Sequence, residues 1–270
     1  MFKRLRNIVL AATVAAVSAN PAIAQTNAES DEETAPIIVR QVVLVHGAFV
    51  DGSGWRGVYD DLTARGYRVS IVQNPLTSLE DDVAATVRTL DKQSGPAILV
   101  GHSWGGTVIT QAGVHPNVVG LVYVAALAPD AGETTAQQYE GYPASPEFVI
   151  ETSSDGFGFV RADRFHSAFA ADLDVAEAAF LRDSQLPIRM SAFETALTNA
   201  AWRDKPSWAI IPSEDRAFGE GMLSGMAQRS GATIVEIPGS DAAFITQPGA
   251  VADVIDSAAR NVPQATNRNN

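Results

Sequence analysis

The stretch Ile98–Gly106 reads Ile-Leu-Val-Gly-His-Ser-Trp-Gly-Gly, and it decides the fold. An apolar run leads into the pattern Gly-x-Ser-x-Gly, and an apolar helical pattern follows. This order predicts a buried strand that turns sharply into a helix, with Ser103 at the apex. Gly101 and Gly105 supply the neighbours without side chains that such a strained turn requires. Ser103 is therefore a candidate nucleophile at the carboxyl end of a central strand.

Apolar strands and amphipathic helices alternate on both sides of this stretch. Strands are predicted at residues 42–45, 67–72, 97–100, 118–125, 207–212 and 233–237, and a closing helix at 248–261. The alternation predicts an α/β fold with a doubly wound, mostly parallel sheet. It breaks after Pro129, where residues 130–200 are rich in phenylalanine and read as helical at 173–182 and 188–201. We interpret this segment as a helical cap inserted over the strand ends.

The chain begins with the three parts of a secretory signal peptide. Residues 1–24 contain a basic start, an apolar run at 8–17 and the cleavage pattern Ala22-Ile23-Ala24. We therefore expect a cut after Ala24 and a periplasmic or secreted protein. The apolar run is too short for a stable membrane anchor, although a retained signal anchor is the alternative.

The remaining sequence divides by its composition. Residues 25–36 are polar and acidic and predict a disordered leader. A single domain is expected over residues 37–262, followed by a loose tail at 263–270.

Charge and cysteine content exclude several classes of function. The net charge of the 270 residues is −12, and it becomes −15 once Lys3, Arg4 and Arg6 leave with the signal peptide. Such acidity disfavours binding to nucleic acids and to anionic membranes. The chain has no cysteine, so it has no disulfide, thiol nucleophile or cysteine-based metal site. Its four histidines lack the spacing of metal ligands, and no metal or other cofactor is expected.

Four motifs together resemble the α/β-hydrolase superfamily. They are Val-His-Gly-Ala-Phe at 45–49, Gly-His-Ser-Trp-Gly-Gly at 101–106, Ser-Glu-Asp-Arg at 213–216 and Pro-Gly-Ser…Gln-Pro at 238–248. Within the superfamily, the chain looks like the cap-bearing group of small esterases, salicylate-ester esterases and hydroxynitrile lyases. The resemblance covers residues 41–261.

The resemblance implies a role for several residues. Ser103 corresponds to the nucleophile, and the backbone N–H groups of Ala48 and Trp104 correspond to the oxyanion hole, which stabilises developing negative charge. Asp215 corresponds to the acid of the catalytic triad, with Glu214 as second choice. The candidate substrate-binding residues are His46, Phe49 and His102.

One position departs from the family pattern. Members of the family typically carry the triad histidine after the last strand, where this sequence has Asp241. A carboxylate with an ordinary pKa of ~3.9 is a much weaker base than imidazole. Asp241 is nevertheless the candidate residue at this position, and His166 in the predicted cap is an alternative base. The side chain of His102 is expected to point away from Ser103.

Two functions of different classes follow from these observations. The first is a serine-dependent hydrolase of small carboxylic esters or lactones, impaired because the base histidine is replaced by Asp241. The alternative is a non-catalytic protein that binds a small molecule on a degenerate hydrolase scaffold, with cap phenylalanines around an apolar pocket. A lyase is a weaker hypothesis because the hydroxynitrile lyases also use the histidine.

Overall fold

The computed structural model describes residues 39–262. The predicted signal peptide, the acidic leader and the tail at 263–270 lie outside these residues. Within the described part, no helix is long and apolar enough to cross a membrane.

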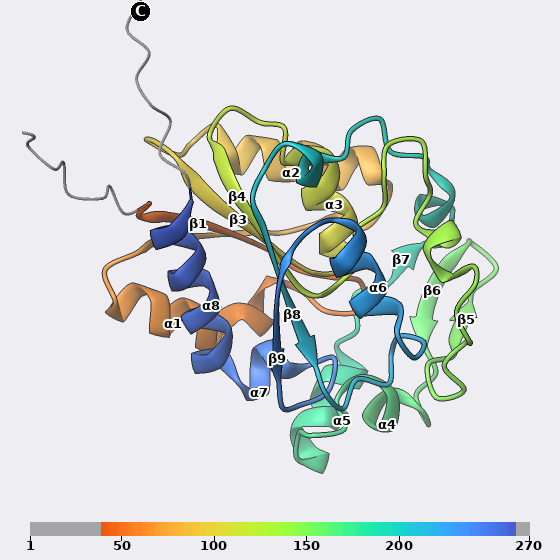
Figure 1. The fold of residues 1–270 in the computed structure, drawn as a ribbon. Coiled ribbons are helices and arrows are strands. Elements are labelled where there is room, and N and C mark those ends of the chain that lie inside the picture. Colours follow the sequence, from red (N-terminus) through yellow and green to blue (C-terminus); the bar gives the residue numbers. More distant parts are fainter. Residues whose placement is uncertain (1–38, 263–270) are drawn as a thin grey trace, which may run out of the picture. The chain divides into compact units, whose positions relative to one another are not determined.

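Six parallel strands form the central sheet, in the order β2-β1-β3-β4-β8-β9. Their bounds are β1 Gln41–Val45, β2 Arg68–Val72, β3 Ala97–Ser103, β4 Val118–Ala126, β8 Ser207–Pro212 and β9 Thr233–Ile237. The chain adds β2 on one side of β1 and then returns to place β3 on the other side (Figure 1). Ser103 therefore ends a strand next to the point where the strand order reverses, which is where open α/β sheets bind ligands.

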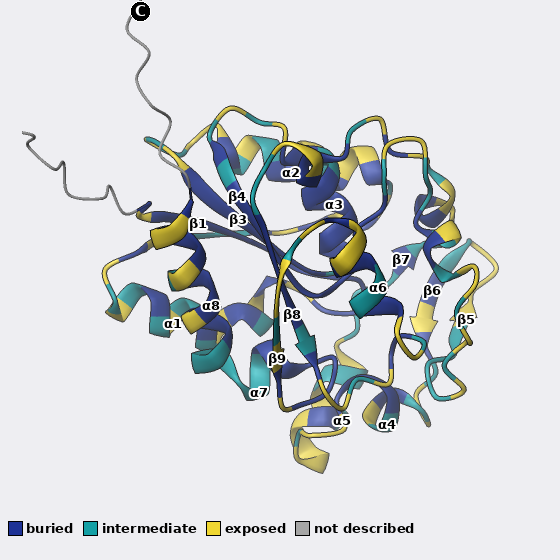
Figure 2. Ribbon diagram, in the orientation of Figure 1, coloured by how far each residue is buried: buried dark blue, intermediate teal, exposed yellow. Residues whose placement is uncertain are grey.

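Helices cover both faces of this sheet. They are α1 Arg56–Ala64, α2 Leu79–Leu90, α3 Trp104–Ala112, α6 Met222–Arg229, α7 Ala243–Thr246 and α8 Pro248–Asn261, with short 3₁₀ helices η1 Gly52–Trp55 and η4 Ala201–Arg203. Helix α1 packs with α8, and α2 packs with α3 (Figure 1). Every residue of β1 and all but the last of β3 are buried, because these strands are covered on both faces (Figure 2).

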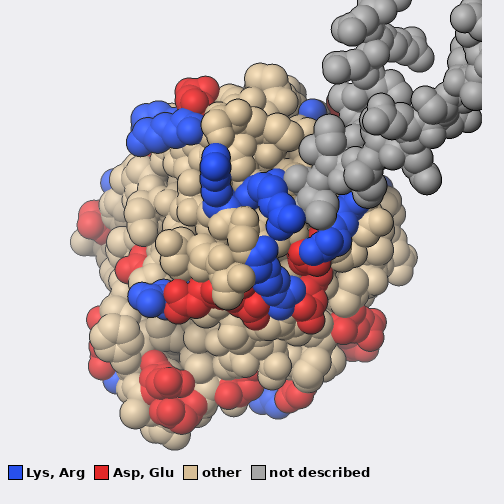
Figure 3. Space-filling view, turned by 90° about the vertical axis from the view of Figure 1, so that its left-hand side faces the viewer, with Lys and Arg blue, Asp and Glu red and all other residues tan. Residues whose placement is uncertain are grey.

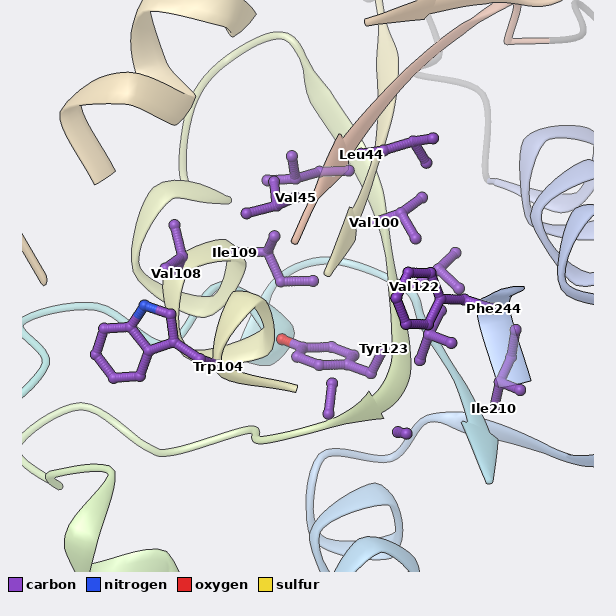
Figure 4. Packing of buried hydrophobic residues seen from close by; sticks show 14 of the residues in the cluster. Leu44, Val45, Val100, Trp104, Val108, Ile109, Val122, Tyr123, Ile210 and Phe244 are labelled. Carbon is purple, nitrogen blue, oxygen red and sulfur yellow. The ribbon is translucent and has the colours of Figure 1, made fainter. Parts of the chain in front are cut away.

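The core extends through the sheet on both sides of its central strands. In Figure 4, Trp104, Val108 and Ile109 of α3 pack on one side, and Phe244 of α7 packs on the other. Phe244 has no exposed surface, like Trp104. The residues that flank the nucleophile turn are thus fixed by core packing on two faces.

Charged side chains link the helices at the surface. Arg65, directly after α1, contacts Asp61 of the same helix and Asp253 of α8, both at 2.7 Å. Figure 3 shows one face on which Lys and Arg side chains lie beside Asp and Glu side chains. Exposed ion pairs of this kind contribute little stability each, so the core determines the fold.

The cap contains a small sheet as well as helices. Strands β5 Ile150–Thr152, β6 Phe157–Val160 and β7 Ile188–Arg189 pair antiparallel, and they accompany α4 Phe165–Phe169, α5 Val175–Asp183 and the 3₁₀ helices η2 Ala136–Tyr139 and η3 Met190–Glu194 (Figure 1). The predicted helix at 173–182 corresponds to α5. The predicted helix at 188–201 is wrong: this segment begins as β7 and continues as η3, because Ile188 and Arg189 pair with Gly158 and Phe157.

Candidate active site

Ser103 lies at the turn between β3 and α3 in a strained backbone conformation. Its φ is 49° and its ψ is −120°, a region that residues with a side chain rarely adopt. A Cβ on Gly101 would lie 2.5 Å from the carbonyl oxygen of Gly105, and a Cβ on Gly105 would lie 2.6 Å from that of Val45. Only glycine fits at either position. This confirms the prediction that the turn requires residues without side chains on both sides of Ser103. The turn leaves Ser103 partly exposed, although every other residue of β3 is buried.

A buried carboxylate supports the residue after Ser103. Asp82 of α2 accepts a 2.7 Å hydrogen bond from the indole Nε1 of Trp104 and a 2.8 Å bond from the backbone N–H of Leu76. Burial raises the pKa of Asp82 to about 6, although both bonds act in the opposite direction. Asp82 was not among the residues predicted from the sequence. It could have been noticed because it lies three residues after Leu79, on the apolar face of the helix.

The loop after β1 lies against Ser103. A Cβ on Gly47 would lie 2.8 Å from the Cβ of Ser103, which makes this a close approach of two backbones. Within residues 39–262, the backbone N–H groups of Ala48 and Trp104 donate to no other group. The N–H of Trp104 opens α3, where no intrahelical acceptor exists. These two donors are consistent with the oxyanion hole that the resemblance implies.

His46 and Phe49 hold this loop in place. His46 is fully buried, its Nδ1 lies 2.8 Å from the carbonyl oxygen of Gly47, and its Nε2 accepts a 2.9 Å bond from the N–H of Asn74. Burial lowers the pKa of His46 to about 4, so the ring is neutral at physiological pH. Phe49 has a φ of 67° and donates its N–H to the carbonyl of Leu186, which follows α5 in the cap. Both ring nitrogens of His46 are thus engaged in supporting the loop.

Asp215 lies in the loop after β8 with one oxygen bonded and one free. Its Oδ1 accepts from the N–H groups of Ala217 and Phe218 at 2.8 and 3.0 Å. Its Oδ2 is buried and has no partner in the described part of the chain. Burial and then the charge of Asp241 raise the pKa of Asp215 to about 8, so it is mostly protonated at neutral pH. The neighbouring Glu214 is exposed.

Asp241 is fully buried and lies against His102. Its Oδ2 is 3.1 Å from His102 Nε2, and its backbone oxygen is 3.2 Å from the same nitrogen. The second carboxylate oxygen, Oδ1, has no partner among residues 39–262. The structure therefore brings Asp241 together with a residue 139 positions earlier, a contact that the sequence did not indicate.

The cap holds the loop that carries Asp241. Asp172, which follows α4, accepts hydrogen bonds from the hydroxyl groups of Ser240 and Thr246. The N–H of Ala242 donates to the carbonyl of Phe169 at 3.0 Å. These bonds fix the residues on both sides of Asp241 to the cap.

The other predicted base is remote from these groups. His166 is exposed on α4, and its Nε2 lies 3.1 Å from the carbonyl oxygen of Leu173 within the cap. His115 lies at the surface, 3.1 Å from Asp91. The structure thus places neither ring beside Ser103.

Comparison with known families agrees with this geometry. A model of the alpha/beta hydrolase family matches residues 42–254. The chain belongs to this family. The match includes β1, the turn at Ser103 and both loops that carry Asp215 and Asp241, and it confirms the α/β-hydrolase fold predicted from the motifs.

Individual relatives of this α/β-hydrolase include enzymes from fungi and bacteria. The chain is 26% identical over 243 residues to an alpha/beta hydrolase of Aspergillus novofumigatus, covering 81% of this chain and 96% of that protein. It is 29% identical over 157 residues to a pyrethroid hydrolase of Sphingobium wenxiniae, covering 50% of this chain and 56% of that one.

Solved structures share its fold at lower identity. A pyrethroid hydrolase superposes with a TM-score of 0.71 at 23% identity, over 82% of this chain and 98% of that one. An extracellular α/β-hydrolase from a Paenibacillus species gives 0.70 at 20% identity, over 82% and 99% of the two chains.

An apolar cavity of about 380 Å³ lies between the cap and the loop after β8 of this α/β-hydrolase. Phe193, on its wall, stacks on Trp104 at 5.1 Å between ring centroids, and Phe148 meets Phe49 edge-on at 6.0 Å. Ala144 and Gly219 also line a neighbouring groove of about 610 Å³ that reaches Asp215. A wall residue of the cavity therefore stacks on the residue after Ser103, and the neighbouring groove reaches Asp215.

The described residues offer no group of three histidine, aspartate or glutamate side chains that could hold a metal ion. What the site contains is a presented serine, two backbone donors and a buried set of His102, Asp215 and Asp241.

Proposed function

We propose that this α/β-hydrolase cleaves small carboxylic esters or lactones with Ser103 as nucleophile. The observation that carries the proposal is the conformation of Ser103, whose φ of 49° stores strain at the apex of a turn that only flanking glycines permit. Membership of a hydrolase family and the named activities of the relatives support the same reaction class.

The reaction follows from the groups around Ser103. Its Oγ attacks the carbonyl carbon, the N–H groups of Ala48 and Trp104 stabilise the oxyanion, and the alcohol leaves an acyl-enzyme that water hydrolyses. The cavity beside Phe148 and Phe193 has the volume and apolar lining for a small acyl or aryl group. We expect slow turnover, because position 241 lacks the family's histidine, although presentation and the oxyanion donors by themselves still give ~1,000–10,000-fold over water.

The test is Ser103→Ala with p-nitrophenyl acetate as substrate and a fluorophosphonate probe for labelling. Wild-type protein should show slow, saturable hydrolysis and a single labelled serine. The variant should lose both, while Ser257→Ala at an exposed position of α8 should behave like wild type. Hydrolysis that persists unchanged in Ser103→Ala would refute the proposal.

The second candidate function is binding of a small molecule without turnover. Asp241 at the position of the family histidine favours it, as does the apolar cavity. It predicts saturable binding of an aromatic ester that a serine-directed inhibitor does not affect, and no burst of product. Labelling of Ser103 by the fluorophosphonate at a saturable rate would argue against it.

A further inference from the structure

The neighbours of the His102 side chain determine which of its two ring nitrogens carries the proton. Its Nε2 lies within hydrogen-bond distance of two oxygens, the Oδ2 and the backbone carbonyl of Asp241. A carbonyl oxygen only accepts, so Nε2 carries a proton and donates. In the neutral ring the other nitrogen, Nδ1, then has a free lone pair.

Nδ1 of His102 is buried, and no group of residues 39–262 bonds to it. Buried polar atoms are nearly always paired, so an unpaired imidazole nitrogen indicates a role that the resting structure does not display. The ring itself is held firmly: it lies 4.2 Å from the Phe244 ring between centroids and meets Trp55 and Phe169 edge-on.

The sequence predicted that the His102 side chain points away from Ser103, but its free nitrogen and the Cβ of Ser103 both lie against Gly47. The position of a Cβ on Gly47 is 3.0 Å from His102 Nδ1 and 2.8 Å from the Cβ of Ser103. The two atoms are therefore no farther apart than the sum of these distances. That upper limit leaves room for one bridging water between Nδ1 and the hydroxyl group of Ser103.

We propose that His102 is the general base of this site and that Asp241 is its positioning residue. This inference rests on the proposed function and deepens it. Ser103 gives its hydroxyl proton to His102 Nδ1 as its Oγ bonds to the carbonyl carbon, whose π electrons move to oxygen. The departing alkoxide takes that proton, and the carbon–oxygen ester bond breaks. Water then loses a proton to Nδ1, attacks the acyl carbon, and Ser103 leaves with the proton.

Asp241 has the two properties that an orienting carboxylate needs. It bonds to the nitrogen opposite the free one, which fixes the tautomer, and it lies where an imidazolium charge would form. Asp215 carries no such bond, since its bonded oxygen accepts from two backbone N–H groups. The dyad of His102 and Asp241 thus replaces the order of residues that the family resemblance implies.

The titratable groups near the ring are few. His46 lies on the loop after β1, and Asp241 on the loop after β9; the partners from η1, α4 and α7 are Trp55, Phe169 and Phe244, which carry no charge. His46 is neutral because burial lowers its pKa to about 4. A change in activity with pH near neutrality that depends on His102 is therefore separable from His46.

The experiment measures kcat/KM for p-nitrophenyl acetate against pH in Asp241→Asn and His102→Gln. The chain offers a matched control pair, because His115 and Asp91 form a surface contact of the same length, 3.1 Å. We expect Asp241→Asn to lower kcat/KM by about 100-fold, since the amide no longer stabilises the imidazolium, and His102→Gln to remove the acidic limb of the pH profile. His115→Gln and Asp91→Asn should stay within about 3-fold of wild type, as surface pairs contribute little.

The outcomes separate this proposal from the proposed function. Activity within about 3-fold of wild type in Asp241→Asn overturns it, as does an acidic limb that persists in His102→Gln. Because His102 is buried, His102→Gln could fail to fold; Asp241→Asn, which keeps the side-chain shape, then decides alone. In either case, loss of activity in Ser103→Ala leaves the nucleophile in place.

Discussion

The nucleophile side of the site and the acid–base side are constrained by different parts of the chain. At Ser103 the contacts are between backbone atoms: Gly105 could not carry a Cβ without meeting the Val45 carbonyl at 2.6 Å. In the loops after β8 and β9 the important groups are the side chains of Asp215 and Asp241, and three buried side-chain atoms have no partner in the described residues, namely Asp215 Oδ2, Asp241 Oδ1 and, on β3, His102 Nδ1. Backbone contacts allow no substitution, whereas side-chain contacts allow the chemistry to change while the fold persists.

The largest effect is expected from breaking the nucleophile side at Gly105. Gly105→Ala places a Cβ against the carbonyl oxygens of Val45 and His46, neither of which can move without disturbing β1. Overpacking of this kind costs about 1–3 kcal/mol or more, and we expect fluorophosphonate labelling to fall at least ~100-fold because the turn no longer presents Ser103.

The control for this change is Gly95→Ala, whose Cβ would meet only the side-chain nitrogen of Gln41, at 3.2 Å. Thermal unfolding and labelling are measured for both variants. Equal stability and labelling of the two would show that the backbone contacts at the turn do not constrain it.

A smaller effect, in this case an increase in activity, is expected from replacing Asp241. Asp241→His restores the histidine that the family order implies at this position, and it also removes the carboxylate that bonds to His102 Nε2. We expect kcat/KM for p-nitrophenyl acetate to rise by up to about 100-fold, because a positioned general base contributes ~100- to 10,000-fold while the lost bond to His102 costs about 100-fold.

The double variant Asp241→His/Asp215→Asn is the control, and it should lose the gain because the new imidazole then lacks its carboxylate. A rate that falls in Asp241→His would mean that the new imidazole does not replace the dyad of His102 and Asp241.

The sequence predicted the elements that depend on local patterns better than the contacts that depend on distant residues. Strand β1 and the turn at Ser103 were predictable because their signals are local: a continuous apolar run for the strand, and two glycines at fixed spacing around a serine for the turn. The bounds of β8 and α8 agree with the predicted 207–212 and 248–261. The cap was predicted less well, since β7 has only two residues and depends on a partner thirty residues earlier.

The sequence indicated candidate site residues but not their contacts. Ser103, Asp215 and Asp241 could be named from motifs. That Asp241 meets His102 could not be, because the contact depends on how a loop places a side chain 139 residues away. Asp82 was missed because a single carboxylate in an apolar stripe resembles an ordinary surface residue until its partners are known.

The smallest effect is expected on the thermal stability, which depends on the protonation of Asp215. The pKa of Asp215 is about 8 in the folded protein, raised by burial and by Asp241, against ~3.9 in an unfolded chain. Between these values the unfolded state releases the proton that the folded state keeps, so stability contributed by this group falls as pH rises from about 4 to 8. Asp215→Asn removes this loss, and its amide oxygen still accepts from Ala217 and Phe218.

The variant should therefore melt higher than wild type at pH 8 by ~2–6 °C, corresponding to about 1–2 kcal/mol, and the difference should vanish near pH 4. Asp163→Asn is the matched control, because the exposed Asp163 has its pKa lowered by Arg161 and should give no gain at pH 8. Melting temperatures followed by circular dichroism across this pH range distinguish the two variants. A variant Asp215→Asn that is no more stable than wild type at pH 8 would show that Asp215 ionises in the folded protein without the free-energy cost that its burial implies.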